Sequence, residues 1–183
     1  MRKVTLTKES TKDILESLLK RSPNNYGKFE STVAEILAKV KSEGDAALFA
    51  YTKEFDKAEV NKENIRVTEV EIQEAYDKID PALLEVIRKA LVNIRKYHEK
   101  QIQNSWFTSE TNGTMLGQKV TPLNRVGVYV PGGKAVYPSS VLMNIVPAKV
   151  AGVPNIVMTT PPGKDGKICA STLVAAKEAG ADE

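Results

Sequence analysis

In the first hundred residues, apolar side chains recur at intervals of three and four, which is the repeat of a helix with one buried face. This spacing predicts three helices, over residues 7–21, 29–40 and 45–55. Ser10 with Asp13 offers an N-terminal cap arrangement for the first helix. Gly44 can end the second helix in the left-handed conformation, and Asp45 can cap the third.

Capping sequences mark two further helix starts. Thr68 followed by Glu71 has the pattern of a capping box. Asp80 followed by Pro81 places a capping acid before a proline in the first helical position. These starts predict helices that run to about residues 79 and 97, and the segment 61–67 is a candidate short strand.

Beyond residue 105 the pattern changes to short β-branched and aromatic runs. Asn112-Gly113 lies between two such runs and predicts a β-hairpin. Strands are predicted over 126–130 and 155–160, a helix over 140–150 with a kink or restart at Pro147, and a last helix over 168–179 with Gly180 as its cap.

A strand, a helix and a second strand in this order predict a parallel βαβ unit. The fold class is therefore α/β: a helical N-terminal region, residues 1–104, and an incomplete Rossmann-like parallel βαβ sheet with a β-hairpin, residues 105–183. In such a layer the last helix returns the chain to another strand, and none follows Gly180. We expect an unpaired strand edge and a partly uncovered apolar sheet face.

Ligands of open parallel sheets collect where the strands end and the loops begin. The residues at these ends are the candidate cofactor-binding residues: Tyr129, Pro131, Gly132 and Pro161, with Gly133 beside them. At the end of a strand, the Tyr129 phenol can stack on a ring or hydrogen-bond a ligand. Paired prolines at 161 and 162 can form a flat apolar wall or only stiffen the loop.

Two common nucleotide-binding motifs are absent. No three glycines have the dinucleotide spacing, and Gly133 occupies the lysine position of a phosphate loop, which disfavours an ATPase or GTPase. The turn at 131–133 could still present N–H groups to an anion, with Ser139 or Ser140 at the start of the next helix. A tight turn followed by a serine cap is the alternative.

Charge and composition narrow the function classes. The balance of 26 basic against 23 acidic residues argues against nucleic-acid binding. Residues 111–164 contain no carboxylate but five cations, which suits an anionic ligand or simply reflects buried strands. The single cysteine, Cys169, excludes an internal disulfide and is expected to be a buried, inert thiol. No membrane-length apolar stretch or leader occurs, which favours the cytoplasm.

Several segments together resemble the histidinol dehydrogenase family. They are VGVYVPGG at 126–133, YPSSVLMN at 137–144, VPAKVAGV at 146–153, the strand ending in Pro161-Pro162, and EGDAALFAYTKEFD at 43–56. The resemblance implies a cytoplasmic, homodimeric, zinc-containing enzyme. It would use NAD to convert L-histidinol through the aldehyde to L-histidine, and Tyr129 would contact the NAD.

The resemblance also implies what this chain lacks. The zinc ligands, the catalytic Glu-His pair and most substrate contacts of the family lie beyond Glu183, so no catalytic or metal residue is assigned here. His98, the only histidine, is expected to be a solvated imidazole near a helix end. Three hypotheses remain: an N-terminal fragment that is inactive alone, a stand-alone nucleotide- or anion-binding module, and a piece that dimerises through a strand edge.

Overall fold

The computed structural model describes residues 5, 7–12, 27–132 and 136–183. The chain divides into two compact units, residues 1–48 and 49–183. Residues 8–12 are helical, and the rest of the predicted helix over 7–21, with Asp13, lies outside the described residues. Thr7 is its cap residue, because the Thr7 N–H donates to Ser10 Oγ (2.7 Å) and the Ser10 N–H to Thr7 Oγ1 (3.1 Å).

The two helices predicted around Gly44 are both present. Helix α2 spans Gly27–Glu43, and Gly44 ends it with a φ of +60°, a left-handed conformation that suits glycine. Helix α3, Asp45–Tyr51, follows directly. The chain then continues as a π-helical turn, Thr52–Asp56, which ends at Lys57 with a φ of 61°.

Capping places the next two helices as predicted. Helix α4 spans Glu69–Lys78, and its capping box joins the Glu71 N–H to Thr68 Oγ1 (3.2 Å) and the Thr68 N–H to Glu71 Oε2 (2.8 Å). Helix α5 spans Pro81–His98, with Asp80 Oδ1 accepting from the Ala82 N–H at 2.8 Å, and a 3₁₀ turn follows at Glu99–Gln101. Both starts follow from local side-chain chemistry.

The strand predicted over 61–67 is wrong, because this segment is a turn. Asn61 Oδ1 accepts hydrogen bonds from the N–H groups of Glu63 (2.8 Å) and Asn64 (3.2 Å). The Ile65 N–H donates to the Asn61 carbonyl at 3.0 Å. An asparagine that binds its own following backbone favours a turn over an extended strand.

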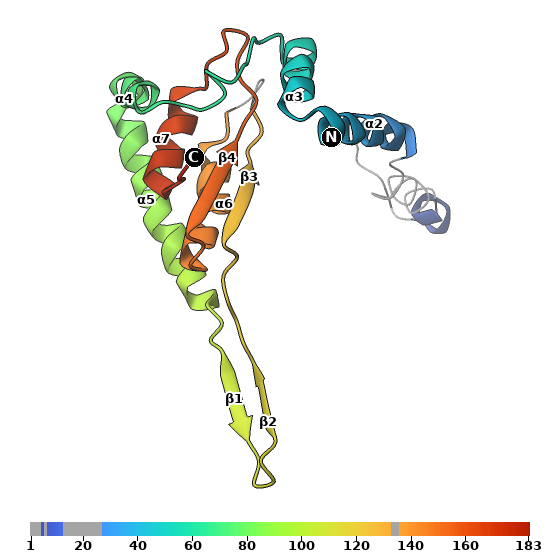
Figure 1. The fold of residues 1–183 in the computed structure, drawn as a ribbon, viewed down its shortest axis with the longest axis vertical. Coiled ribbons are helices and arrows are strands. Elements are labelled where there is room, and N and C mark those ends of the chain that lie inside the picture. Colours follow the sequence, from blue (N-terminus) through green and yellow to red (C-terminus); the bar gives the residue numbers. More distant parts are fainter. Residues whose placement is uncertain (1–4, 6, 13–26, 133–135) are drawn as a thin grey trace. The chain divides into compact units, whose positions relative to one another are not determined.

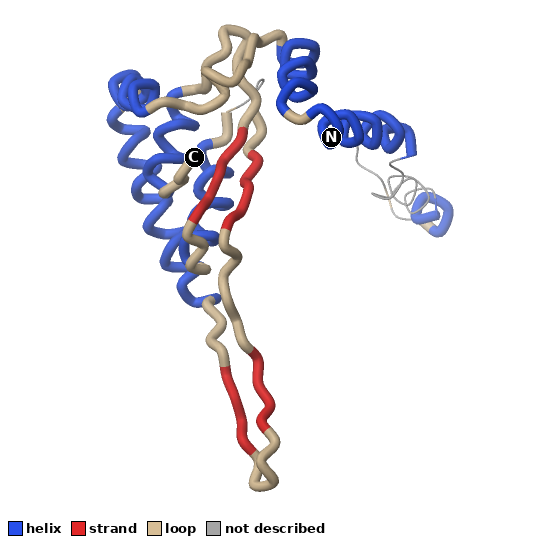
Figure 2. The backbone as a smooth tube through the Cα atoms, viewed as in Figure 1, coloured by secondary structure: helices blue, strands red, loops and turns tan. Residues whose placement is uncertain are grey.

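The predicted hairpin extends away from the other elements of residues 49–183 (Figures 1 and 2). Strand β1, Trp106–Ser109, pairs antiparallel with β2, Met115–Gln118. Gly113 has a φ of +85° in the turn, and the Thr114 N–H donates to Asn112 Oδ1 at 2.9 Å. Every residue of both strands is exposed.

The predicted βαβ unit forms the rest of the sheet. Its elements are β3 (Arg125–Tyr129), α6 (Pro138–Val150), β4 (Asn155–Thr159) and, beyond it, α7 (Ala170–Ala179). Strands β3 and β4 are parallel, with Tyr129 opposite Thr159. Helix α6 passes through Pro147 without the restart expected there. Met143, whose carbonyl loses its donor, is exposed, so water can satisfy that carbonyl.

Within residues 49–183, the described helices lie on one face of this sheet (Figure 1). Val128 of β3, Val130 just beyond it and Ile156 of β4 join one core with apolar residues of α4, α5, α6 and α7. Arg125, Gly127 and Tyr129 alternate with them and are exposed. Among the described residues of this unit, the strands are therefore buried on one side and open on the other, as the sequence predicts.

One edge of the sheet differs from the prediction. The Asp182 N–H donates to the Ile156 carbonyl (2.9 Å), and the Met158 N–H donates to the Glu183 carbonyl (2.8 Å). Residues 182 and 183 thus pair with the second edge of β4, which is not bare. The outer edge of β3 has no main-chain partner within the described ranges.

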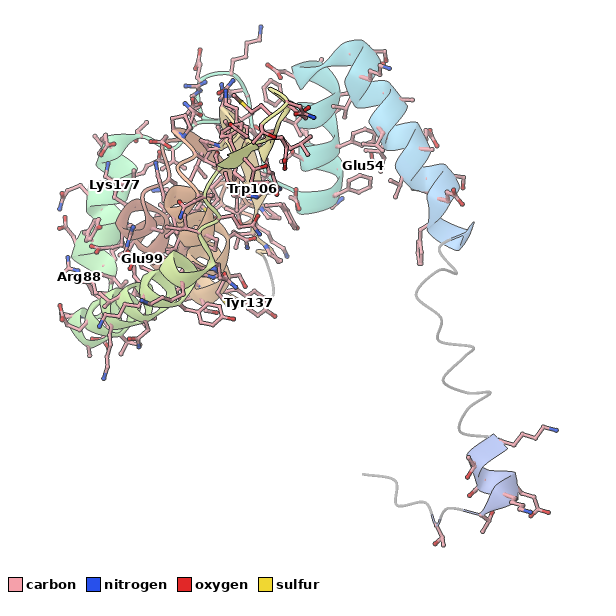
Figure 3. The ribbon with its side chains drawn as sticks, turned by 90° about the horizontal axis from the view of Figure 1, so that it is seen from below. Glu54, Arg88, Glu99, Trp106, Tyr137 and Lys177 are labelled. Carbon is pink, nitrogen blue, oxygen red and sulfur yellow. The ribbon has the colours of Figure 1, made fainter. Side chains whose placement is uncertain are left out.

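Polar contacts fasten α4 and α5 to α7. Glu178 of α7 accepts two hydrogen bonds from the Arg88 guanidinium (2.9 and 3.1 Å) and one from the Tyr76 hydroxyl (2.9 Å). Lys177 of α7 pairs with Glu69 at 2.8 Å, and Arg88 and Lys177 lie on the side of the molecule formed by α4 and α5 (Figure 3). These helices pack on the α/β layer, while the predicted domain boundary between residues 104 and 105 stays a prediction.

Candidate ligand-binding site at the strand ends

The loops that follow β3 and β4 touch each other. The Val130 N–H donates to the Thr159 carbonyl at 2.9 Å, so pairing extends one residue beyond β3. A Cβ on Gly132 would lie 3.0 Å from both Thr160 Oγ1 and the Pro161 carbonyl oxygen. A side chain at 132 would require these neighbours to shift by a few tenths of an ångström, so a glycine here favours the close approach of the two loops.

A cavity of about 260 Å³ opens beside this contact. It is lined by Gly132, Val136, Thr160, Pro161, Gly163, Asp165, Lys167, Ile168, Cys169 and Thr172. Two of the four candidate cofactor-binding residues, Gly132 and Pro161, therefore lie in one wall. The cavity is at the carboxyl ends of the parallel strands, where ligands of such sheets are expected.

The other two candidates lie near the cavity in sequence but do not line it. Tyr129 ends β3 on the open face of the sheet, and its side chain is 62% exposed. Its hydroxyl has no hydrogen-bond partner in the part of the chain that the structure describes. Pro131 is exposed in the loop that follows, and Gly133 lies outside the described residues. The Tyr129 ring is free to stack on a ligand that leaves the cavity toward the open face.

A compact loop leads from β4 into α7. The Gly163 N–H donates to the Lys167 carbonyl (2.8 Å), and Asp165 Oδ1 accepts from the Lys167 N–H (3.1 Å). Gly166 has a φ of +74°, which closes the turn. These bonds lie within the loop and hold the floor of the cavity.

Helix α7 begins at the cavity without a side-chain cap. Cys169 occupies the cap position, and its thiol is 3.5 Å from Ser171 Oγ. The expectation of a buried thiol is wrong: Cys169 is exposed, because α7 starts at Ala170, two residues later than predicted, and the buried face begins at Thr172. Thr172, which also lines the cavity, is only 5% exposed.

The first turn of α6 has fewer free N–H groups for an anion than the sequence suggested. Tyr137 is its cap residue and Pro138, which has no N–H, comes first. The N–H groups of Ser140 and Val141 both donate to the Tyr137 carbonyl (3.0 and 3.4 Å). Neither Ser139 nor Ser140 caps this helix, so the serine-cap alternative is wrong.

The charges around the cavity are mixed. Lys164 and Lys167 outnumber Asp165 in the loop. Lys167 also faces α4: the pKa of Glu74 is lowered first by Lys78 and then by the Lys167 charge. No cluster of three or more His, Cys, Asp or Glu residues suited to a metal occurs within the described ranges. The cavity can therefore hold a polar or anionic group, and its residues do not fit a zinc site.

A second cavity, of about 350 Å³, lies at the opposite ends of the strands. It is lined by residues from the end of α5, the segment before β3 and the end of α6, including His98, Pro122 and Val150. His98 Nδ1 is 2.6 Å from Gln101 Oε1. None of the candidate cofactor-binding residues lines this cavity, and the strand-end cavity is the better candidate site.

Comparison with known proteins decides the family. Residues 19–183 match the model of the family described as Histidinol dehydrogenase. The chain belongs to the histidinol dehydrogenase family. Among histidinol dehydrogenases, that of Heliobacterium mobile is 62% identical over 151 residues, which is 82% of this chain and 35% of the relative. That of Bacillus subtilis is 56% identical over 149 residues, 81% of this chain and 34% of the relative.

A solved structure of the same family agrees with the fold. Histidinol dehydrogenase from Elizabethkingia anophelis matches with a TM-score of 0.78 and 35% identity, covering 85% of this chain and 35% of that one. Our chain thus spans about a third of the length of these histidinol dehydrogenases. The α/β class with its parallel βαβ unit and hairpin is confirmed.

Sequence reasoning missed the far wall of the cavity. Thr160, Cys169 and Thr172 line it, yet none was a candidate. Thr160 immediately precedes Pro161, so the strand-end argument could have reached it. Thr172 had no such signal, because a threonine inside an apolar helix looks like ordinary core until the start of the helix is fixed.

Proposed function

We propose that this chain forms the NAD-binding side of a histidinol dehydrogenase, which oxidises L-histidinol through the aldehyde to L-histidine. Family membership supports the activity. The observation that carries the site is the cavity at the carboxyl ends of β3 and β4, walled by Gly132 and Pro161. When bound, NAD supplies the acceptor for the hydride that leaves the substrate.

The residues present fit a dinucleotide. The missing side chain of Gly132 lets the two loops that wall the cavity approach each other, because a Cβ there would lie 3.0 Å from Thr160 Oγ1 and from the Pro161 carbonyl oxygen. Pro161 supplies an apolar wall, and the exposed ring of Tyr129 supplies a stacking surface with a free hydroxyl. Pro131 fixes the loop between Tyr129 and Gly132.

The remaining parts of the proposal concern groups that this chain does not supply. One histidine and one cysteine cannot furnish a common zinc site, so we propose that the zinc ligands and the catalytic residues belong to sequence matching the rest of the relatives. Residues 1–183 alone are then expected to bind NAD without oxidising histidinol.

A cytoplasmic location without nucleic-acid or membrane partners is proposed with this role. No helix in the described ranges has the length and apolarity to cross a bilayer.

Calorimetric titration with NAD tests the site. Tyr129→Ala removes the exposed ring at the strand end and is expected to weaken NAD binding by roughly tenfold, since stacking on an aromatic ring contributes about 1–3 kcal/mol. Tyr97→Ala is the matched control, because Tyr97 on α5 is 65% exposed and Tyr129 is 62% exposed. Equal loss in both variants, or in neither, would contradict the proposed role of Tyr129.

A further inference from the structure

The carboxylate of Asp165 is held in the wall of the strand-end cavity by its own loop. Its Oδ1 accepts a hydrogen bond from the Lys167 N–H at 3.1 Å. It also lies against Gly163, where a Cβ would be 2.7 Å from Asp165 Oδ1 and 3.3 Å from the Lys167 carbonyl oxygen. The carboxylate can lie there because residue 163 has no side chain. The loop therefore orients this group without the help of a ligand.

No cation in the described part of the chain pairs with this carboxylate. Lys164 and Lys167 are close to it in sequence, but neither forms an ion pair with it. The charge of Lys167 acts on α4 instead, where Lys78 and then Lys167 lower the pKa of Glu74. Asp165 Oδ2 accepts no hydrogen bond from a described residue, so it is open to a donor on a ligand.

The size and lining of the cavity suit one part of a dinucleotide. Its volume of about 260 Å³ is below the roughly 300–1,000 Å³ of sites that enclose a drug-sized ligand. Val136, Pro161 and Ile168 give it an apolar side, and Asp165 is the one carboxylate among the lining residues. An apolar wall beside a charged acceptor fits a nucleoside, which has a flat base and a ribose with hydroxyl donors.

The place of Asp165 in the fold indicates which hydroxyl it accepts from. It lies in the loop after β4, the second strand of the βαβ unit. In dinucleotide-binding βαβ units, an acidic residue downstream of the first turn accepts a hydrogen bond from the ribose 2′-hydroxyl, and cofactors with a 2′-phosphate need a cation there instead. A carboxylate at this position thus favours a free 2′-hydroxyl over a 2′-phosphate.

We propose that Asp165 selects NAD over NADP, because its carboxylate accepts a hydrogen bond from the 2′-hydroxyl of the adenosine ribose and repels a phosphate there. The inference rests on the proposed function and deepens it, since it assigns the adenosine ribose to the strand-end cavity.

Calorimetric titration of the 183-residue chain with NAD and NADP tests this role. The wild type should bind NAD at least roughly tenfold more tightly than NADP. Asp165→Asn keeps an acceptor for the Lys167 N–H, so the turn is retained, and it removes the charge. This variant should bind NAD roughly tenfold more weakly and lose most of its preference over NADP, because hydrogen bonds to charged groups are the stronger ones.

Asp77→Asn is the matched control. Asp77 is also an exposed carboxylate that accepts a hydrogen bond, here from Gln73 Nε2 at 3.1 Å, and it lies on α4 outside the cavity lining. This change should leave both affinities as they are in the wild type. The 2′-deoxyadenosine analogue of NAD completes the test: the wild type and Asp165→Asn should bind it equally, because the hydroxyl that Asp165 contacts is missing.

The outcomes separate the inference from the proposed function. If the wild type binds NAD but Asp165→Asn weakens it no more than Asp77→Asn does, the inference fails and the proposed function stands. The same holds if the wild type binds NADP as tightly as NAD, or if Asp165→Asn weakens the 2′-deoxy analogue as much as NAD. A wild type that binds no NAD would overturn the proposed function, and the inference with it.

Discussion

The ring of Phe107 in β1 packs directly against the α-carbon of Gly117, its cross-strand partner in β2. A Cβ at this position would collide with Phe107 Cδ1, lie 2.9 Å from Phe107 Cγ and 2.5 Å from the Trp106 carbonyl oxygen. The backbone contact cannot be relieved by turning the ring alone. Gly117→Ala should therefore destabilise the hairpin by about 1–3 kcal/mol, the usual cost of overpacking.

Hydrogen exchange of the β1 and β2 amides measures this effect. Gly127→Ala is the matched control: Gly127 also lies in a strand, but a Cβ there meets nothing within 4 Å. The control should leave exchange across its own strand unchanged or slightly slower, since alanine reduces the entropy of the unfolded chain. Similar exchange in the Gly117 variant and the wild type would mean that the ring does not pack against this glycine.

Individual residues were predicted correctly from the sequence where their role depends on neighbouring backbone groups. Thr68, Asp80 and Gly44 were predictable because each acts on backbone groups a few residues away. Cys169 was not, because its exposure depends on where α7 starts, which no side-chain cap marks. The same uncertainty concealed Thr172, so the part of the cavity wall formed by Cys169 and Thr172 could not be predicted from the sequence.

At the scale of elements, Glu178 is the main polar contact between α7 and its neighbours. Its side chain is 18% exposed and binds both Arg88 and Tyr76. Glu178→Ala should lower the free energy of unfolding by about 1–2 kcal/mol, a value reduced for the partial exposure of Arg88. Glu85→Ala is the control, because Glu85 also pairs with Arg88 (3.3 Å) but is 73% exposed, and it should cost less than about 0.5 kcal/mol.

The pH dependence of the Glu178 effect has a defined sign. Hydrogen bonds from Arg88, opposed by burial and aided by Tyr76, lower the pKa of Glu178 below its usual value. The contribution is thus fully present above the unfolded pKa of about 4.3 and is lost as the pH falls through the lower folded pKa. Urea unfolding of wild type and variant should show a difference at pH 7 that shrinks on acidification. A difference that grows in acid would contradict this account.

Elements were predicted best where their pattern is local. The capping signals and apolar stripe of α5 and the Asn-Gly turn of the hairpin needed no knowledge of the rest of the chain. The segment 61–67 failed because the hydrogen bonds of Asn61 outweighed its weak strand pattern. The pairing of residues 182 and 183 with β4 joins segments separated by α7, and no local pattern announces it.

At the scale of the whole molecule, the hairpin has exposed apolar side chains on both faces. Trp106 and Leu116 share one face and Phe107 and Met115 the other, and each is between 52% and 68% exposed. Contiguous apolar surface of this kind commonly marks an interaction site. We therefore propose that this arm contacts a second copy in the homodimer that the family resemblance implies.

Sedimentation of the chain over a range of concentrations tests that role. Leu116→Ser on the hairpin should shift the monomer–dimer equilibrium toward monomer by roughly tenfold, because a buried leucine contributes about 1.5–3 kcal/mol. Val86→Ser on α5 is the matched control, since Leu116 and Val86 are both 61% exposed. A chain that is monomeric at all concentrations, or one equally affected by both changes, would contradict the role of the hairpin.

The central claim is that NAD binds at the carboxyl ends of β3 and β4. Photolabelling with an azido derivative of NAD, followed by peptide mapping, locates the bound adenine most directly. The account predicts labelling in peptides that contain residues 129–132 or 160–163, and competition by unmodified NAD. Competed labelling confined to the cavity beside His98, at the opposite ends of the strands, would contradict it.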